Sequence, residues 1–223
     1  MASDSFTNSD GTALATHDAN WASVTGFTGA VTIQSNQARG PDFANSAWRY
    51  TTSSSDDSQI VKKAQAALGN NRYGVCVRMG SASIGYSLRL RTLSGDNFTE
   101  AAVYKHTTYV ASSTGITISR LSDITLRIQA TASGGDQQIR IWVNGAATNF
   151  GYSEGGTTYS GAVLTDPSAN TPITSGSPGF LANNGSAAQA ETYFDDWDDL
   201  VSGGASRVHL LTGKLGFPLT GKL

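Results

Sequence analysis

Tryptophan and arginine are the residues of this chain whose types and spacing suggest ligand-binding chemistry. Trp142 lies in a run that alternates apolar and polar residues, and this run and three similar ones carry arginine among their polar positions. The set is Arg78, Arg89, Arg91, Arg127 and Arg140. Arginine forms forked hydrogen bonds to carboxylates and stacks on aromatic rings, while an indole offers a flat apolar surface for a sugar ring. Together they predict a carbohydrate-binding face.

The four runs have the period-two pattern of half-buried strands. They are residues 73–80, 85–93, 124–130 and 138–144, each bounded by turn residues such as Gly, Ser, Asp and Asn. We expect neighbouring antiparallel strands with one apolar face and one face that bears arginine. On this arrangement the five arginines gather near Trp142 on one side of a sheet. The alternative is that they form the ordinary solvated face of a half-buried sheet.

Three local signals add to this pattern. Asn144-Gly145 is the strongest hairpin signal, because both central positions of the favoured turn take positive φ, and it should lead to a partner strand at about 148–152. Residues 60–68 are the one candidate helix, although nine residues are too few to be stable without packing. Cys76 lies in an apolar alternation, so it forms no disulfide within the chain and is expected to be an inert strand residue.

The segment 151–177 is longer than a structural connection needs to be and is rich in Gly, Thr and Ser. Tyr152, Tyr159 and Glu154 on this segment could shape the mouth of a ligand site. An excursion that is disordered or contacts a partner is the alternative interpretation.

The composition indicates one all-β domain. The 223 residues hold 25 glycines and only 14% charged residues, and helical periodicity is nearly absent. The net charge of −2 argues against nonspecific nucleic-acid binding, which needs a basic surface. No run approaches the ~20 apolar residues of a membrane span, and the N-terminus has no secretory signal pattern. We therefore expect synthesis in a cytoplasm.

Five short motifs resemble, in order, the concanavalin A-like lectin/glucanase (laminin-G-like) jelly rolls. They are Phe6-Thr7-Asn8-Ser9-Asp10-Gly11 with Asn20-Trp21, Gly74-Val75-Cys76-Val77-Arg78, Ile139-Arg140-Ile141-Trp142-Val143-Asn144-Gly145, Gly176-Ser177-Pro178-Gly179-Phe180 and Tyr193-Phe194-Asp195-Asp196-Trp197. The resemblance covers about residues 4–200 and implies an all-β, antiparallel two-sheet sandwich whose first and last strands lie close together. We expect this domain over residues 1–200, followed by an extended tail over 201–223.

The acidic residues do not have the spacing of a glycosidase of this family. The family's glucanases place glutamates at i, i+2 and i+4 of one strand, because glycoside hydrolysis needs paired carboxyl groups. This chain has three isolated glutamates, Glu100, Glu154 and Glu191. The acidic run 195–199 matches a structural position of the family at the final strand. We therefore expect a protein that is not an enzyme.

A structural calcium ion is implied by the resemblance, although no cofactor is required. Many family members hold Ca²⁺, which prefers six to eight oxygen ligands. If the terminal strands pair, they should bring together Asp4, Asp10, Asp195 and Asp196. The alternative is that these aspartates serve turns and caps of their own backbone.

The C-terminal tail repeats one unit, Leu-Thr-Gly-Lys-Leu, at 211–215 and 219–223. Residues 201–223 contain three basic residues and no acidic one, and they follow the Gly-rich hinge at 202–204. Such a segment cannot form its own core, so we interpret it as a docking peptide, with a frayed terminus as the alternative. The expected docking residues are Leu211, Lys214, Leu215, Phe217, Leu219, Lys222 and Leu223.

Two functions follow from these features. The first is a virion structural protein of a bacteriophage, because the tail resembles the short repeats that close some phage structural proteins. Such a protein would bind other virion proteins through its tail, decorate the particle as a homo-oligomer or in many copies, and display a sandwich that binds host-surface glycans. The second is a free carbohydrate-binding module. A glycoside hydrolase or polysaccharide lyase is the less favoured third reading.

Overall fold

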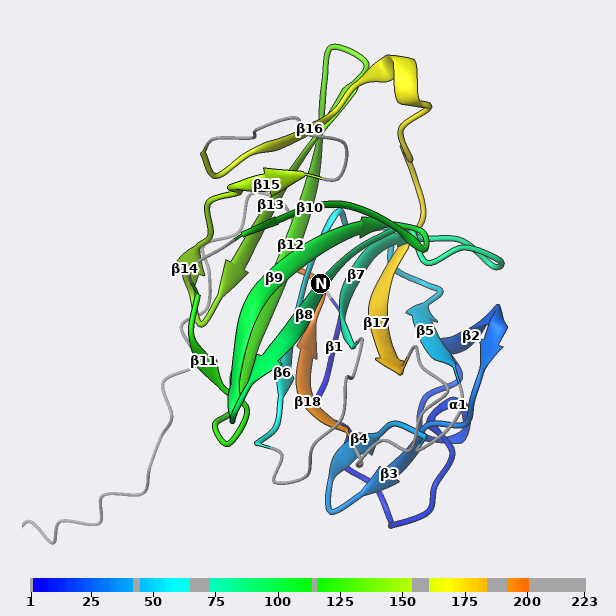
Figure 1. Cartoon of the computed structure of the whole chain (residues 1–223). Helices are drawn as coiled ribbons and strands as arrows, with labels where there is room; N and C mark the ends of the chain where they lie inside the picture. The colour runs from blue at the N-terminus through cyan, green and yellow to red at the C-terminus, as the bar shows by residue number, and fades with distance from the viewer. Residues whose placement is uncertain are drawn as a thin grey trace, which may run out of the picture.

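The computed structural model describes residues 2–41, 45–64, 73–113, 116–153, 161–183 and 192–200. These residues form two antiparallel sheets that pack face to face, so that β8, β9 and β10 lie in front of β6, β12 and β18 in Figure 1. The predicted all-β, two-sheet jelly-roll sandwich is confirmed. The tail, with every docking residue predicted on it, lies outside the described residues.

Each sheet contains nine strands. Sheet A consists of β1 (Ser3–Asp4), β3 (Thr32–Gln34), β4 (Gln37–Arg39), β6 (Asp57–Lys62), β12 (Ile124–Ser133), β13 (Asp136–Val143), β14 (Ala146–Ala147), β16 (Leu164–Asp166) and β18 (Tyr193–Asp198). Sheet B consists of β2 (Trp21–Thr28), β5 (Ser46–Tyr50), β7 (Gly74–Met79), β8 (Tyr86–Ser94), β9 (Asn97–Lys105), β10 (Thr108–Ser113), β11 (Ile118–Ser119), β15 (Tyr152–Ser153) and β17 (Ser177–Asn183).

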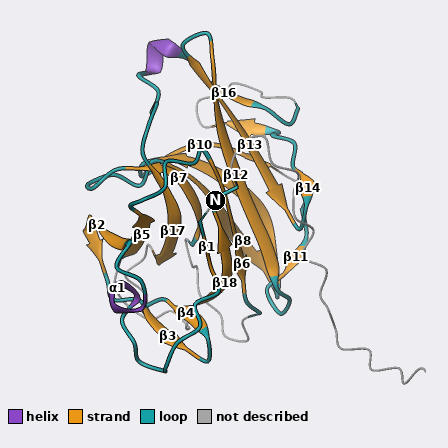
Figure 2. Ribbon diagram, turned by 180° about the vertical axis from the view of Figure 1, so that it is seen from behind, coloured by secondary structure: helices purple, strands orange, loops and turns teal. Residues whose placement is uncertain are grey.

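Helix is confined to two short pieces in the described part of the chain (Figure 2). They are α1 (Leu14–His17) and the 3-10 turn η1 (Ser168–Asn170). No described helix is long and apolar enough to cross a membrane. Strand pairing and packing between the sheets therefore carry the fold.

The strand order separates the four strands that carry the arginines. Sheet A runs β14-β13-β12-β6-β18-β4-β3, and sheet B runs β15-β10-β9-β8-β7-β17-β5-β2. β7 pairs with β8 and β12 pairs with β13, as the alternation predicts. The two pairs nevertheless lie in different sheets, so the prediction of one arginine-bearing face is wrong. Alternation shows which residues share a face of a strand, but not which strands share a sheet.

The core lies between the sheets and follows the predicted alternation. Ile128 and Ile141 of sheet A and Val75 and Leu88 of sheet B are buried. At one end the packing becomes aromatic, where the ring of Trp21 lies 4.8 Å from that of Trp197 and 5.2 Å from that of Phe180, between ring centroids. Edge-to-face pairs of this kind stabilise by about 0.5–1.5 kcal/mol each beyond their burial.

The terminal strands pair as the family resemblance implies. In the antiparallel ladder of β1 and β18, Ser3 lies opposite Asp198 and Asp4 opposite Trp197. β18 in turn pairs with β6 on its other side. The two ends of the domain are thus joined in sheet A.

Two local predictions need correction. Residues 60–62 belong to β6 and are not helical, because this segment is the central strand between β12 and β18; residues 65–72 lie outside the described part. The Asn144-Gly145 turn forms with φ of 51° and 78°, but its partner is β14, which is closer to the turn than 148–152.

Candidate ligand-binding face

A row of side chains crosses six strands on the outer face of sheet A. The paired residues are Ser3, Asp198, Gln59, Arg127, Trp142 and Ala147, from β1, β18, β6, β12, β13 and β14 in turn. Gln59, Arg127 and Trp142 are partly exposed, whereas the residues on either side of each in sequence are buried. We call this set the Trp142 row. It combines a hydroxyl, a carboxylate, an amide, a guanidinium and an indole.

The indole of Trp142 is supported by a fixed cation. The guanidinium carbon of Arg127 lies 4.3 Å from the centroid of the Trp142 ring. Asp57 accepts hydrogen bonds from Nε and Nη2 of Arg127 at 2.8 and 2.5 Å and from Nε2 of Gln129 at 3.0 Å. The Asp57 side chain is only 2% exposed. This forked pair holds the arginine over the ring, so the orientation of the indole is fixed before any ligand arrives.

Arg140 is the other predicted residue that lies with Trp142. It precedes Trp142 by two positions in β13, so both side chains project from the same face, and its Nη2 donates to Oε1 of Gln138 at 3.5 Å. The structure thus places Arg127 and Arg140 on the same face of sheet A as Trp142. Their role in binding stays a prediction.

A groove of about 580 Å³ opens beside the row, between the β1–β18 pair and the turn after β13. Its lining residues are Ser3, Asp4, Ser5, Gln59, Val61, Thr125, Asn144, Gly145, Asp196, Trp197 and Asp198. The turn is held in place because the Thr125 amide donates to Oδ1 of Asn144 at 3.0 Å. The sequence pattern does not predict this groove, because its walls come from three separate parts of the chain.

The groove follows from a bulge in β18. Asp195 pairs with Val61 and Asp198 with Gln59, so two residues of β18, Asp196 and Trp197, lie opposite one residue of β6. Trp197 is buried and donates from Nε1 to Oγ of Ser58 at 3.1 Å, while Asp196 is exposed at φ 45°. A non-glycine residue at positive φ costs of order 1 kcal/mol, which the burial of the neighbouring tryptophan offsets.

Within the part of the chain that the structure describes, the residues that line the groove include three carboxylates and no Lys or Arg. Asp4 already accepts hydrogen bonds from Nε2 of His17 at 2.8 Å, Nε1 of Trp21 at 2.7 Å and the Phe6 amide at 2.7 Å. Asp196 is the exposed one of the three. The groove therefore offers hydrogen-bond acceptors and a negative potential.

Arg89 and Arg91 lie on the other sheet and are not near Trp142. Arg89 is fully buried, donates to Oγ of Ser87 and to the His106 carbonyl, and lies 4.0 Å above the Tyr104 ring. Arg91 lies 5.1 Å from the Tyr109 ring centroid and 3.7 Å from the carboxylate of Glu100. The outer face of sheet B thus has its own cluster of arginine and tyrosine. Sequence reasoning missed both tyrosines, although Tyr104 continues the alternation of its strand.

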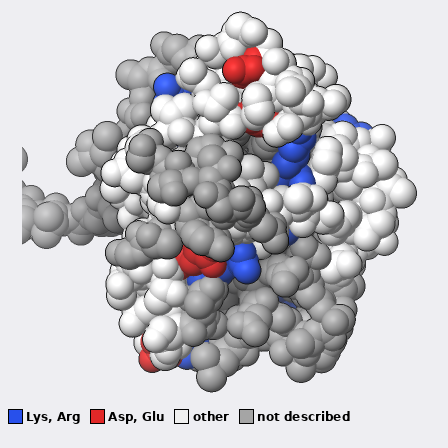
Figure 3. All heavy atoms as spheres, turned by 45° about the horizontal axis from the view of Figure 1, so that its top comes forward, with Lys and Arg blue, Asp and Glu red and all other residues white. Residues whose placement is uncertain are grey.

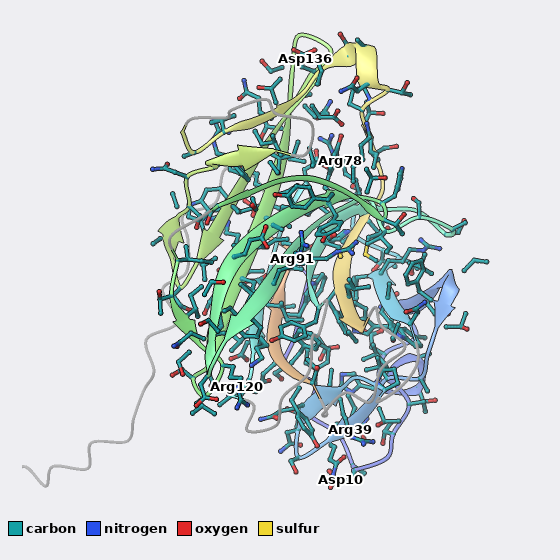
Figure 4. All side chains as sticks on the ribbon, viewed as in Figure 1. Asp10, Arg39, Arg78, Arg91, Arg120 and Asp136 are labelled. Atoms are coloured by element: carbon teal, nitrogen blue, oxygen red, sulfur yellow. The ribbon has the colours of Figure 1, made fainter. Side chains whose placement is uncertain are left out.

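Arg78 links the two sheets at one end of the sandwich. Its φ of 57° breaks the alternation, and its guanidinium binds both carboxylate oxygens of Asp56 at 2.7 and 2.8 Å. It also donates to Gln137 and to the carbonyl of Ala130 in sheet A. Figure 4 shows Arg78 at the upper end and Arg91 farther down on β8. Arg78 is therefore a structural clamp, and its predicted place beside Trp142 is wrong.

Tyr152 belongs to β15 at the edge of sheet B, where its Cα pairs with that of Ser112. It is therefore in the sheet opposite to Trp142. Glu154 and Tyr159 lie outside the described residues. Residues 164–166 of the long segment form β16, which pairs with β13, so this part of the segment is structural.

The four predicted metal ligands do not converge. Asp10 accepts the Ser35 amide, and Asp195 accepts the Asp196 amide. Burial and the adjacent Asp196 raise the pKa of Asp195. In the described part of the chain, no group of three or more His, Cys, Asp or Glu residues could hold a metal ion. The expected cluster is wrong because these aspartates bind different partners: Asp4 binds His17 and Trp21, Asp10 binds Ser35, and Asp195 binds its own neighbour. Figure 4 places Asp10 beyond β3, at the lower end of the molecule.

Cys76 lies in β7 and is fully buried, as expected of an inert strand residue. Burial raises the pKa of its thiol to about 12, although Arg89 opposes this. A thiol with this pKa is not a nucleophile at neutral pH.

The comparisons with known proteins agree on the architecture. No protein-family model matches the sequence, and the search of curated proteins finds no match. Among solved structures, an endo-1,3-beta-glucanase from Streptomyces sioyaensis has a TM-score of 0.55 and 12% identity, covering 88% of this chain and 94% of that chain. This likeness concerns the fold alone, the two-sheet jelly-roll sandwich.

Two further similar structures have lower TM-scores. The legume lectin-like domain from Entamoeba histolytica has a TM-score of 0.49 and 14% identity, covering 83% of this chain and 91% of that chain. The carbohydrate-binding module CBM66 from Bacillus subtilis has a TM-score of 0.48 and 13% identity, covering 79% of this chain and 92% of that chain. At these identities the likeness describes the fold and leaves the site to be argued from the residues.

Proposed function

We propose that this chain is a non-catalytic carbohydrate-binding protein whose ligand lies on the outer face of sheet A. The observation that carries the proposal is the indole of Trp142, held by Arg127 and Asp57 in one row with the polar groove. A fixed aromatic ring beside convergent hydroxyl, amide and carboxylate groups is the combination that recognises sugars, whose rings have apolar faces and polar edges.

A binding role fits the groove better than hydrolysis does. A glycosidase needs two carboxyl groups in different roles, one of them an acid with a raised pKa. The pKa of Asp195 is raised, but this residue is not part of the groove lining. Glu100 lies on the opposite sheet beside Arg91. We therefore expect no release of reducing ends from the ligand.

The first ligand to test is a β-1,3-glucan oligosaccharide, because the Streptomyces structure with this fold is described as an endo-1,3-beta-glucanase. We expect Trp142→Ala to weaken binding of the pentasaccharide at least tenfold in isothermal titration calorimetry. A tenfold loss corresponds to about 1.4 kcal/mol. The reason is that the substitution removes the stacking surface while the backbone of β13 keeps its pairing.

Tyr109→Ala is the matched control, because it removes an aromatic side chain from the outer face of the opposite sheet. The affinity of this variant for the pentasaccharide should equal that of the wild type. If Tyr109→Ala abolishes binding and Trp142→Ala does not, the ligand lies on sheet B and our assignment of the face is wrong. If neither variant nor wild type binds on a broad glycan array, the proposed function fails.

The virion role predicted from the tail stays a prediction, as does localisation to a particle. It rests on the repeat and the positive charge of residues 201–223, and the fold comparisons do not bear on it. Deletion of residues 205–223 should abolish association with a particle and leave glycan binding unchanged. Undiminished association after the deletion would remove this role.

A further inference from the structure

We infer that the Trp142 row takes a linear, uncharged oligosaccharide of at least three sugar residues, laid across the strands from Trp142 toward β1 and β18. This inference rests on the proposed function. It adds the length, direction and charge of the ligand.

The length follows from the register of sheet A. Between Trp142 and Asp198 the row passes through Arg127 and Gln59 without a missing strand. Neighbouring strands are about 4.8 Å apart, so this distance is about 14 Å. The strand spacing is comparable to the length of one sugar ring in an extended chain. A chain that stacks on Trp142 and crosses the strands therefore needs at least three sugar residues to reach Asp198 on β18.

The direction follows from the groove. Its floor consists of Gln59, Val61 and Thr125, which are partly exposed and belong to the two strands between Trp142 and β18. The turn at Asn144 forms one wall and the bulged β18 forms the other. Both walls are held by hydrogen bonds within the protein, so the groove exists before the ligand binds. Binding of a long ligand therefore costs little free energy for ordering the protein.

The charge preference follows from the side chains along this path. Asp4, Asp196 and Asp198 line the groove, and among the described residues that line it there is no Lys or Arg. The charge of Arg127 is already paired with Asp57 through two hydrogen bonds. A carboxylate on the ligand would meet like charges and no cation among the described lining residues, and like-charge contacts weaken binding. Sugar hydroxyls instead donate to these carboxylates.

The test is a series of β-1,3-glucan oligosaccharides, from disaccharide to pentasaccharide, titrated against the full chain. We expect wild-type affinity to rise at least tenfold from the disaccharide to the tetrasaccharide and then to level off. Trp142→Ala should weaken every member of the series. Gln59→Ala should leave the disaccharide unchanged and weaken the pentasaccharide at least threefold, because only the longer chain reaches β6.

The preference for an uncharged ligand is tested with a carboxymethylated form of the same pentasaccharide. The wild type should bind it at least fivefold more weakly than the neutral form, and Asp196→Asn should reduce this difference. Asp10→Asn is the matched control: it removes the same charge away from the groove and keeps an oxygen that can accept the Ser35 amide. It should behave as the wild type.

The outcomes separate this inference from the proposed function. If Trp142→Ala has no effect on any oligosaccharide, the proposed function itself is wrong. Suppose instead that Trp142→Ala weakens binding, but that affinity depends neither on the length of the oligosaccharide nor on the Gln59 side chain. The site then takes a single sugar and the inference is wrong. Equal affinity for the carboxymethylated and neutral pentasaccharides would overturn the charge preference. Tryptophan fluorescence of each variant shows that it is folded.

Discussion

Several of the charged side chains that the sequence suggests as ligand-binding groups form ion pairs within the protein. Arg78 binds Asp56, Arg127 binds Asp57 and Asp4 binds His17. The alternation of apolar and polar residues predicts that Arg127 lies beside Trp142, because the two strands that carry them form one hairpin. Asp56 lies 22 positions from Arg78 and Asp57 lies 70 positions from Arg127, and no local pattern predicts these pairs.

Lys62 illustrates a buried charge that the sequence does not reveal. Its side chain is fully buried, its Nζ donates to the Arg120 carbonyl at 3.2 Å, and it lies 5.6 Å from the ring centroids of Tyr73 and Phe98. Burial, with a smaller effect of Arg120, lowers its pKa to about 8, although Asp123 acts in the opposite direction.

The pKa of Lys62 predicts how stability changes with pH. Below pH 8 the amine is charged in both the folded and the unfolded protein, so folding bears the full cost of burying the charge. Between about pH 8 and 10.5 the folded state loses its proton first, and the contribution of Lys62 to the free energy of unfolding rises by up to about 3 kcal/mol. Lys62→Met should therefore stabilise the protein by about 1–2 kcal/mol at pH 7, and this advantage should disappear toward pH 10.

Urea unfolding of wild type and Lys62→Met at pH 7 and at pH 9.5 measures this difference. The comparison between the two proteins cancels the titration of tyrosines and other groups. A difference in stability that is the same at both pH values would show that the charge of Lys62 is not destabilising in the folded protein.

At the scale of elements, the sequence predicts strands and hairpins better than it predicts sheets. The pairs β7–β8 and β12–β13 follow from alternation and from turn residues. Their assignment to different sheets depends on β17 and β6, which are distant in sequence and pair with them. The bulge in β18 and the positive φ of Arg78 escape prediction for a related reason, because each is stabilised by contacts with residues distant in sequence, Ser58 for Trp197 and Asp56, Ala130 and Gln137 for Arg78.

The clamp at Arg78 should contribute strongly to stability. Its side chain is 1% exposed and joins β7 to Asp56, Gln137 and Ala130. Arg78→Met should lower the free energy of unfolding by about 2 kcal/mol, because it leaves the Gln137 side chain and the Ala130 carbonyl without their buried partner, whereas Asp56 is 36% exposed and water can solvate it. Thermal or urea unfolding measures the loss.

Arg91→Met is the control for this substitution. Arg91 is 32% exposed and forms a long ion pair of 3.7 Å with Glu100, so its removal should cost at most about 1 kcal/mol. If the two variants lose equal stability, Arg78 is not a clamp between the sheets.

For the whole molecule, the resemblance of short motifs predicted the architecture that the structure shows. The order of the motifs was enough to predict the sandwich and the pairing of its first and last strands, because the jelly roll is defined by the order of its strands. Only part of the proposed ligand face was predictable from the sequence: Trp142, Arg127 and Arg140 follow from alternation, whereas the groove depends on which strands share a sheet. The coloured atoms of Figure 3 show acidic and basic groups in small adjacent patches on the face in view, which agrees with the small net charge of −2.

The most direct test of the account is a nuclear magnetic resonance titration of the labelled protein with the β-1,3-glucan pentasaccharide. We predict that the largest shifts occur at the Trp142 indole and at the backbone amides of Arg127, Gln59 and Asp198, with little change in sheet B. Shifts confined to Tyr104, Tyr109 and Arg91 would place the ligand on the opposite sheet and contradict the account.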